Sequence, residues 1–233
     1  MVNIWPIIDH IGGGRCPLCN HPGQRLCAAC AAALPHNHHP CPGCALPLPL
    51  DVPAGVYCAE CQAWTPKFDR VIAPLVYETP VDELVARFKY HHQLHLGPLL
   101  AGIVAAATRR ETAGVDLLLP VPLSAARFRE RGFNQAAELV RCLTRGNGIP
   151  WTAGRLIRTR DDGHQQTLGR RSRQRNVRGV FAVRGDLPAR VALVDDVVTT
   201  GATADAASRV LKTAGVEWVE VWAVARTPRE RKS

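Results

Sequence analysis

The chain has 233 residues, of which 46% are hydrophobic and 21% are charged, and its formal net charge is +9. These values are typical of a water-soluble folded protein, and no apolar run approaches the ~20 residues of a membrane-spanning helix. The first ten residues also lack the basic start and long apolar stretch of a secretory signal. We therefore expect a cytoplasmic protein without membrane insertion, with one sizeable core and a small module.

Eight of the nine cysteines lie between residues 16 and 61, and all eight form Cys-x-x-Cys pairs. The pairs are Cys16/Cys19, Cys27/Cys30, Cys41/Cys44 and Cys58/Cys61. Two sulfurs on one tight turn can both reach a tetrahedral ion at ~2.3 Å, and disulfides are unexpected in the cytosol. The pattern predicts a module over residues 1–66 that is held together by two structural Zn²⁺ sites with four thiolates each.

The order in which the four pairs combine is open at this point. The sequential arrangement, first pair with second and third with fourth, gives loop lengths typical of zinc ribbons, but a cross-braced arrangement also fits. His36, His38 and His39 lie between the second and third pairs. They are alternative ligands, although a solvated loop is favoured because the sulfurs already complete both sites. The ninth cysteine, Cys142, is expected to be a small core residue.

Beyond residue 67 the pattern alternates between apolar runs and amphipathic segments. Strands are predicted at 71–77, 116–121, 156–157, 180–183, 190–194 and 217–225, and helices at 81–90, 99–109, 134–144 and 202–214. This alternation predicts an α/β domain over residues 67–233, with a mostly parallel sheet flanked by helices.

Arginines gather in two places in this second part. Three of them, Arg127, Arg129 and Arg131, follow the predicted strand 116–121. The second group lies in residues 155–184, which hold nine arginines and two aspartates. Its central part, 158–176, is predicted to be a loop with a helical turn. It is either a solvated loop or a phosphate-binding one, since the arginine fork suits bidentate phosphate binding.

The segment 191–203 carries the strongest functional pattern, an apolar run followed by Asp195, Asp196 and a small loop, Thr199-Thr200-Gly201-Ala202-Thr203. Backbone N–H groups in such a loop, at the start of a helix, can bind an anion. The two carboxylates would repel that anion, but they can accept hydrogen bonds from vicinal hydroxyls or lie near a metal ion. A ribose 5-phosphate unit satisfies both requirements, whereas an ordinary strand–turn–helix is the structural alternative.

This segment resembles the signature of the type I phosphoribosyltransferases, which bind 5-phosphoribosyl 1-pyrophosphate (PRPP) together with Mg²⁺. The resemblance implies that Asp195 and Asp196 hold the ribose hydroxyls and that the Thr/Gly loop holds the 5′-phosphate. With Arg131 the two acids form the implied catalytic set. The implied PRPP ligands are Val121, Pro122, Arg127, Val194, Asp195, Asp196, Val197, Thr199, Thr200, Gly201, Ala202 and Thr203. Lys89 is a weaker candidate, because a helix-end lysine beside an aromatic residue usually faces solvent.

The order of motifs over nearly the whole chain is similar to that of the ComF family. The shared parts are the cysteine module, Phe88-Lys89-Tyr90, the Pro-Val-Pro-Leu at 120–123, Arg131-Gly-Phe-Asn-Gln135, Gln165, Leu168, Arg175-Asn176-Val177 and the signature. The resemblance implies a role in the uptake of transforming DNA. Two functions are therefore open: a phosphoribosyltransferase with an unknown acceptor, and a protein that binds PRPP and single-stranded DNA without turnover. The zinc module is also a candidate site for a protein partner.

Overall fold

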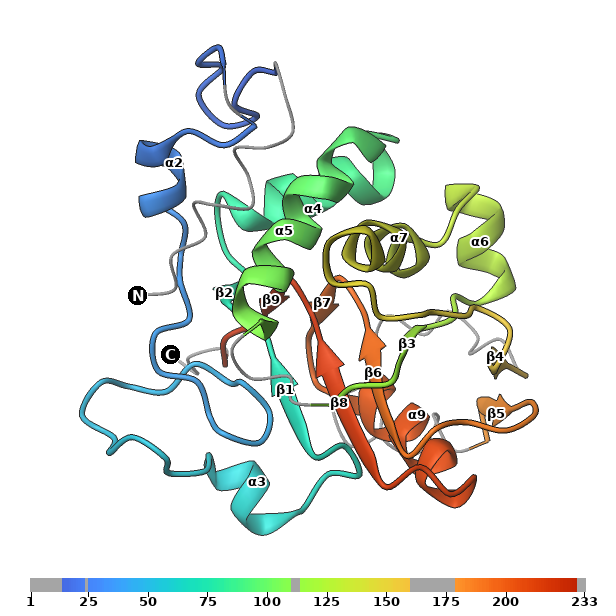
Figure 1. Cartoon of the computed structure of the whole chain (residues 1–233). Coiled ribbons are helices and arrows are strands. Elements are labelled where there is room, and N and C mark those ends of the chain that lie inside the picture. Colours follow the sequence, from blue (N-terminus) through green and yellow to red (C-terminus); the bar gives the residue numbers. More distant parts are fainter. Residues whose placement is uncertain (1–13, 24, 110–113, 160–178, 230–233) are drawn as a thin grey trace.

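The computed structural model describes residues 14–23, 25–109, 114–159 and 179–229. Its centre is a parallel sheet with the strand order β1-β8-β6-β3 (Figure 1). The strands are β1 (Arg70–Ile72), β3 (Leu117–Pro120), β6 (Arg190–Val194) and β8 (Trp218–Trp222). The predicted α/β fold with a mostly parallel sheet is confirmed.

Three of these strands continue after a two-residue gap as a second parallel sheet, in the order β2-β9-β7. Its strands are β2 (Leu75–Val76), β7 (Val197–Val198) and β9 (Ala225–Arg226). The prediction of single strands over 71–77 and 217–225 was therefore wrong, since each one divides in two. One physical reason is Pro74, which has no N–H to donate to a ladder.

Backbone hydrogen bonds still cross this gap, so the sheet bends without coming apart. The Asp195 N–H donates to the Trp222 carbonyl (3.0 Å), and the Val224 N–H donates to the Asp196 carbonyl (3.0 Å). Both acids of the signature thus occupy the bend between β6 and β7, where the carboxyl ends of the parallel strands meet. This is the edge at which open α/β sheets place their ligands.

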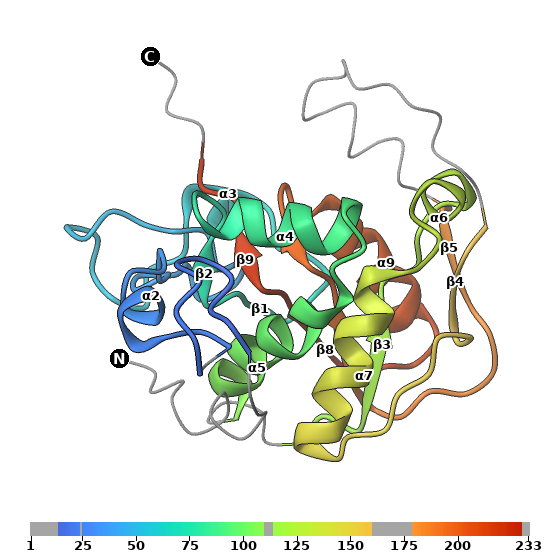
Figure 2. The same ribbon diagram turned by 90° about the horizontal axis from the view of Figure 1, so that it is seen from above.

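The two faces of the sheet are covered by different helices (Figures 1 and 2). Ala192 and Val194 of β6 belong to a core with helices α4 (Val81–Tyr90), α5 (Gly97–Thr108) and α7 (Gln135–Asn147). Val191 and Leu193 belong to a second core, with α9 (Ala202–Thr213). The alternation follows from the two-residue period of a strand and confirms a sheet that is buried on both sides.

The sequence explains how these helices start, stop and face the core. In α4 the buried residues Val81, Leu84, Val85 and Phe88 have the spacing of one helical face, as predicted. The N-cap of α7 is Asn134, whose side chain accepts from the Ala136 N–H (2.9 Å). Among the described helices, none is long and apolar enough to cross a bilayer.

The remaining elements lie at the margins of the sheet. They are α2 (Ala28–Ala32), α3 (Ala59–Ala63), the 3₁₀ turn η1 (Leu94–Leu96), α6 (Ala125–Arg131), β4 (Leu156–Arg158) and β5 (Phe181–Val183). Strands β4 and β5 pair with each other antiparallel, outside the parallel sheets. Helix α6 was not predicted, although Ser124 caps its start and Gly132 ends it in the left-handed conformation.

Candidate functional site

The eight paired cysteines form two separate clusters. The first contains Cys16, Cys19, Cys27 and Cys30, and the second contains Cys41, Cys44, Cys58 and Cys61. Within each cluster the sulfur atoms all lie within 4.8 Å of one another. The sequential pairing of the Cys-x-x-Cys turns is therefore confirmed, and the cross-braced alternative is excluded.

The geometry of both clusters fits a zinc ion. A tetrahedral site with Zn–S bonds of ~2.3 Å places neighbouring sulfurs about 3.8 Å apart. The Sγ atoms of Cys19 and Cys27 are 3.5 Å apart, and those of Cys44 and Cys58 are 3.6 Å apart. The Cys58 N–H also donates to Cys41 Sγ (3.2 Å). The Cys44 thiol is the main cause that lowers the pKa of Cys41 to about 4, whereas the same contact raises the pKa of Cys44 and burial raises that of Cys61. Metal binding must therefore displace protons from this cluster.

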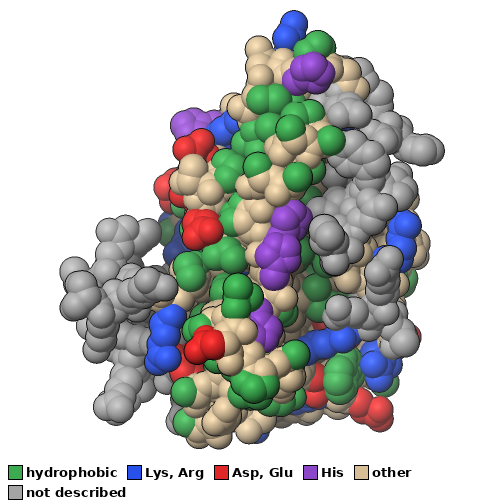
Figure 3. Space-filling model, turned by 90° about the vertical axis from the view of Figure 1, so that its left-hand side faces the viewer, with side chains coloured by type: hydrophobic (Ala, Val, Ile, Leu, Met, Phe, Trp, Pro, Cys, Tyr) green, Lys and Arg blue, Asp and Glu red, His purple; other side chains and the backbone are tan. Residues whose placement is uncertain are grey.

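Neither cluster includes a histidine. His36 Nε2 lies 3.0 Å from the Ala31 carbonyl, and His39 Nδ1 lies 2.9 Å from the Pro49 carbonyl. His38 is exposed, whereas His36 and His39 are half-buried. Histidine side chains are visible at the surface on this side of the molecule in Figure 3. Cys142 is half-buried against the core of α4, α5 and α7, as expected.

The Thr/Gly loop connects β7 to α9. Gly201 adopts the left-handed conformation (φ 77°) at the N-cap of α9, which other residues adopt only at a cost. The Thr200 hydroxyl accepts from the Ala202 N–H (3.3 Å). A hollow of about 30 Å³ opens at this loop. It is lined by Val121, Asp195, Val197, Val198, Thr199, Thr200, Gly201, Ala202, Thr203, Ala204 and Val221.

Eight of the twelve implied PRPP ligands line this hollow, and Asp196 lies between the lining residues Asp195 and Val197. Pro122 is half-buried beyond the end of β3, and Val194 is buried in β6, so neither lines the hollow. Arg127 is exposed on α6. The structure thus brings the acid pair and the Thr/Gly loop together, with the end of β3 beside them.

Arg226 of β9 fixes the orientation of two peptide groups at the start of the Thr/Gly loop. Its guanidinium donates to the carbonyls of Val198 (3.1 Å) and Thr199. Because the C=O and N–H of one trans peptide point in opposite directions, the N–H groups of Thr199 and Thr200 point away from Arg226. Among the described residues, neither N–H has a hydrogen-bond acceptor.

The acid pair lies beside a lysine. Asp196 is 3% exposed, and its carboxylate forms an ion pair with Lys89 at the end of α4. The Lys89 side chain is only 15% exposed, so the expectation that it faces solvent was wrong. Burial lowers the pKa of Lys89 to about 8, while the charge of Asp195 opposes that shift.

Asp195 is half-buried, and its Oδ1 accepts from the Asp196 N–H (2.9 Å). Burial raises the pKa of the Asp195 carboxyl to about 6, although the charges of Lys89, Arg127 and Arg131 favour its ionised form. The two acids therefore differ: Asp196 is held by a fixed cation, and Asp195 titrates near neutrality.

Arg131 lies at the end of α6 and is 6% exposed. One of its amino groups donates to the Tyr90 hydroxyl (3.0 Å), and its Cζ lies 4.8 Å from the centre of the Tyr90 ring. Its Nε and Nη1 are buried and have no acceptor among the described residues. A buried guanidinium with free N–H groups is costly by itself, so these groups are suited to an incoming anion.

Two residues of the site were missed by the sequence analysis. Tyr90 belongs to the Phe88-Lys89-Tyr90 motif, but the sequence does not indicate that it contacts Arg131. Arg226 could not be singled out from the sequence, because several arginines lie close together in this part of the chain and no motif distinguishes it. The arginine-rich segment 158–176, apart from Arg158 and Thr159, lies outside the described residues.

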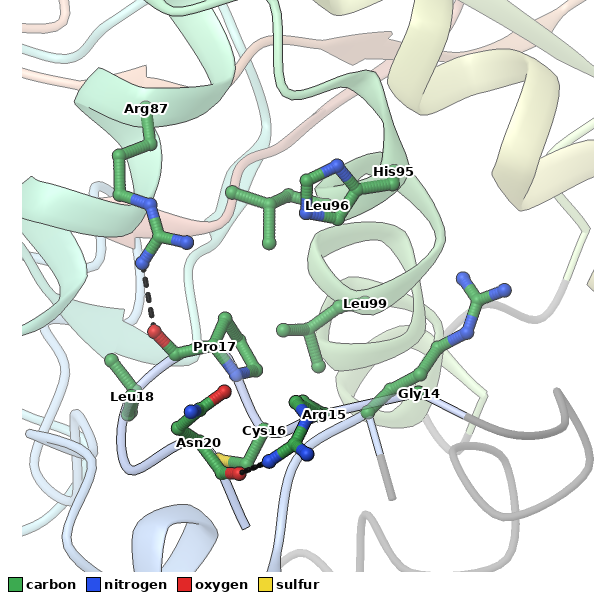
Figure 4. Close-up of a pocket in the computed structure, with 11 residues that line it drawn as sticks. Gly14, Arg15, Cys16, Pro17, Leu18, Asn20, Arg87, His95, Leu96 and Leu99 are labelled. Atoms are coloured by element: carbon green, nitrogen blue, oxygen red, sulfur yellow. Dashed lines mark hydrogen bonds between the residues drawn. The ribbon is translucent and has the colours of Figure 1, made fainter. Parts of the chain in front are cut away.

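A larger hollow of about 680 Å³ lies elsewhere, between the first zinc cluster and helices α4 and α5 (Figure 4). Arg15, Arg25, Arg87 and His95 contribute to its lining. Arg87 of α4 donates to the Pro17 carbonyl (2.8 Å), and Arg15 donates to the Asn20 carbonyl (3.1 Å). The Arg87 bond holds the first Cys-x-x-Cys turn against α4, whereas the Arg15 bond closes the segment of the turn on itself.

Comparison with known proteins agrees with these observations. Residues 7–62 match the double zinc ribbon domain. The DNA utilization protein YhgH of Salmonella typhimurium is 30% identical over 92% of this chain and 97% of its own length. Competence protein F of Haemophilus influenzae is 34% identical over 73% of this chain and 78% of its own.

Among solved structures, the glutamine PRPP amidotransferase of B. subtilis is 22% identical, with a TM-score of 0.37. The match covers 58% of this chain and 30% of that one. The likeness is weak at that score, so the fold assignment depends on the strand order and the bend described above. The zinc clusters, this fold and the two relatives together show that the chain belongs to the ComF family.

Proposed function

We propose that the Thr/Gly loop and the acid pair at the carboxyl edge of the sheet bind PRPP over the small hollow between them, and that the chain transfers its phosphoribosyl group to an acceptor with release of pyrophosphate. The observation that carries this proposal is the juxtaposition of two features. A loop whose Thr199 and Thr200 N–H groups have no acceptor among the described residues lies beside two carboxylates in the bend of the sheet.

The loop is suited to the 5′-phosphate. The free N–H groups and the N-terminus of α9 provide donors and a partial positive charge. The side chains of Thr199, Thr200 and Thr203 add hydroxyl donors, and residues 199–203 contain nothing bulkier than threonine. The fixed charge of Arg226 beneath the loop favours the bound anion further.

The acid pair is suited to the ribose. Carboxylates accept hydrogen bonds from the 2′- and 3′-hydroxyls, and Asp195 is the half-buried member that a ligand can reach. Lys89 pairs with the carboxylate of Asp196 within the buried bend. A bound ribose would therefore meet Asp195 first, with Asp196 held in place behind it by Lys89.

The pyrophosphate group would lie toward the end of β3 and α6. Arg131 offers two buried nitrogens without acceptors there, and Arg127 lies on the same helix. When bound, Mg²⁺ would be held by the pyrophosphate oxygens and one carboxylate, and would neutralise part of the leaving group's charge.

The chemistry of the transfer follows from these positions. The bond between ribose C1 and the pyrophosphate oxygen breaks, and its electron pair leaves with the pyrophosphate. The acceptor's nucleophilic atom forms the new bond to C1 and loses its proton to the surroundings. Positive charge develops on the ribose ring in between, so the carboxylates stabilise the transition state and Arg131 stabilises the leaving group.

A second candidate is a protein that binds PRPP and single-stranded DNA without turnover. The names of the relatives, competence protein F and DNA utilization protein, favour a role in handling DNA. The excess of seven positive charges in residues 155–184 suits a phosphate backbone. The segment has no aromatic residue between Trp151 and Phe181 on which bases could stack, so we give this candidate second place.

Titration calorimetry with PRPP and Mg²⁺ tests the shared part of both candidates. The double variant Asp195→Asn with Asp196→Asn should bind PRPP at least about 100-fold more weakly, because charge-assisted hydrogen bonds contribute about 1.5–3 kcal/mol each. Asp116→Asn is the matched control, since this exposed carboxylate lies at the opposite end of β3. Equal affinity in the double variant and the wild type would contradict the assignment.

Turnover separates the two candidates. Wild-type protein incubated with PRPP, Mg²⁺ and a cell metabolite extract should release pyrophosphate, and the double variant should not. Binding of PRPP without pyrophosphate release from any extract fraction would favour the second candidate. In that case affinity for single-stranded DNA should fall steeply with salt.

A further inference from the structure

Arg226 joins two parts of the chain that are far apart in sequence. Its Nε donates to the carbonyl of Cys44, a ligand of the second zinc cluster (2.9 Å). Its Nη1 donates to the carbonyls of Val198 (3.1 Å) and Thr199, at the start of the Thr/Gly loop, and to that of Thr227 (3.1 Å). One side chain therefore contacts both the metal cluster and the proposed phosphate site.

The position of Arg226 makes this contact rigid. The residue is 2% exposed, and among the described residues no carboxylate pairs with it. A buried guanidinium is tolerated only when its N–H groups are satisfied, and here backbone carbonyls from several segments satisfy them. The Nε–H has the Cys44 carbonyl as its acceptor, so a shift of that carbonyl would leave a buried N–H of the guanidinium without a partner.

The Cys44 carbonyl is the one whose position depends on the metal. It belongs to the turn Cys41–Cys44, which closes when both sulfurs bind one ion. The neighbouring Gly43 carbonyl accepts from the Val71 N–H of β1 (2.9 Å), so the closed turn also extends the edge of the sheet. Without zinc nothing ties the two sulfurs of the turn to one point, so the turn loses the bond that keeps it closed.

The first cluster has a different connection. Its turn Cys16–Cys19 is held by the bond from Arg87 to the Pro17 carbonyl, on the side of α4 and α5. Cys16 and Cys27 pack in the core that contains these helices, whereas Cys41, Cys44 and Cys58 pack in the core that contains α9. Among the described residues, no side chain joins the first cluster to the Thr/Gly loop.

We propose that Arg226 is a positioning residue that couples the second zinc cluster to the phosphate loop, so that PRPP and zinc at Cys41, Cys44, Cys58 and Cys61 strengthen each other's binding. The first cluster is not coupled in this way. The inference depends on the proposed function, since it takes PRPP as the ligand of the loop. Because coupling between two sites is reciprocal, PRPP binding must slow the loss of zinc from the second cluster.

Cysteine alkylation during chelation of the zinc-loaded protein measures this directly. A chelator removes zinc, an alkylating reagent traps the exposed thiols, and mass spectrometry distinguishes Cys16–Cys30 from Cys41–Cys61. With PRPP and Mg²⁺ present, the second set should react at least about fivefold more slowly, at the lower end of typical coupling between sites. The first set should react at the same rate with and without PRPP.

Variants assign the effect to the side chain. Arg226→Met should abolish the protection of the second set, and Arg226→Lys should restore part of it, since an ammonium group keeps the charge but lacks the fork. Arg87→Met is the matched control, because this arginine also donates to a carbonyl of a zinc-binding turn, in the first cluster. It should leave the protection by PRPP unchanged.

Three results would overturn the coupling: equal protection of both sets, protection of neither, or full protection in Arg226→Met. The comparison within the wild type needs no variant and decides the matter if Arg226→Met does not fold. Calorimetry on the same sample separates the two proposals. PRPP binding without protection refutes the coupling alone, whereas no PRPP binding refutes the proposed function and the coupling together.

Discussion

The two zinc clusters are chemically alike but belong to different parts of the fold. Each has four cysteines in two Cys-x-x-Cys pairs, taken in sequential order. The first packs in the core of α4, α5 and α7, and the second packs in the core of α9 on the other face of the sheet. The two ligand sets are identical, but their surroundings differ. In the part of the chain that the structure describes, a side chain, Arg226, joins the second cluster but not the first to the Thr/Gly loop.

The ligand set of a structural metal site therefore does not indicate which part of the fold the site stabilises. The second cluster lies where the chain enters the sheet, and the segment that follows it contacts α9. The Lys67 N–H donates to Asp205 in the first turn of that helix (2.7 Å), and Phe68 lies close to Gly201. We infer that the first cluster stabilises the helix layer, while the second shapes the edge of the ligand site.

The largest effect on PRPP binding is expected when the two clusters are removed one at a time. Cys41→Ser with Cys44→Ser should weaken PRPP binding by about 5- to 150-fold, the usual range of coupling between two sites, because the loop then loses the support of Arg226 and of the closed turn. Cys16→Ser with Cys19→Ser should keep the PRPP affinity within about threefold, since additivity holds for distant sites. Calorimetry gives the affinities, and metal analysis should give one zinc per chain in each variant. Equal losses of affinity would refute the difference.

The second test is the pH dependence of PRPP binding. The pKa of Asp195 is raised by burial to about 6, so the carboxylate gains a proton as the pH falls below 6. Affinity for PRPP should then fall by up to about tenfold per pH unit. The same fall in PRPP affinity at low pH should persist in the Cys16→Ser/Cys19→Ser variant. The Asp195→Asn variant shows how much of the fall in affinity comes from protonation of PRPP itself. An unchanged fall in this variant would exclude Asp195 as its cause.

The same pKa predicts the effect of Asp195 on stability. A raised pKa in the folded state means that the native protein holds this proton more tightly than the unfolded chain. The resulting stabilisation is present below about pH 4 and is lost as the pH rises through about 6. Asp195→Asn should therefore stabilise the ligand-free protein above pH 6 and have little effect at pH 4, as measured by urea unfolding.

Arg87→Met tests the first cluster without touching its cysteines. The loss of the hydrogen bond to the Pro17 carbonyl should lower the free energy of unfolding by about 1–3 kcal/mol, the usual cost when a charged donor's bond is lost. PRPP affinity should remain unchanged. A variant with full stability, or one with weakened PRPP binding, would contradict the separate roles of the two clusters.

The smallest expected effect is that of Gly43→Ala in the second cluster. The new Cβ would lie 3.1 Å from a ring carbon of Tyr57, and Tyr57 is exposed enough to shift. We expect a loss of about 1 kcal/mol in unfolding free energy. Gly146→Ala in α7 is the control, because it meets open space and should stabilise the chain by about 0.5–1 kcal/mol. A stabilising Gly43→Ala would show that this turn is not closely packed.

Local patterns were predicted well. Helix α4 has the predicted bounds and the predicted buried face, and the acid pair and its loop lie at the carboxyl edge of the sheet. The division of the chain into 1–66 and 67–233 stays a prediction. The bend that divides three strands was missed, because hydrogen bonds to neighbouring strands decide where a strand ends. Lys89 was misjudged because its burial depends on α4 lying against the bend.

The sequence alone was enough to predict two metal sites from eight paired sulfurs. It also located two acids followed by a small loop, for which we propose anion binding. These features are local, since the ligands of each turn are only a few residues apart. The tertiary structure alone decided which residues act together across long distances. Arg226 lies 182 residues after Cys44 and Arg131 lies 41 residues after Tyr90, so only the packing of the sheet and helices reveals these contacts.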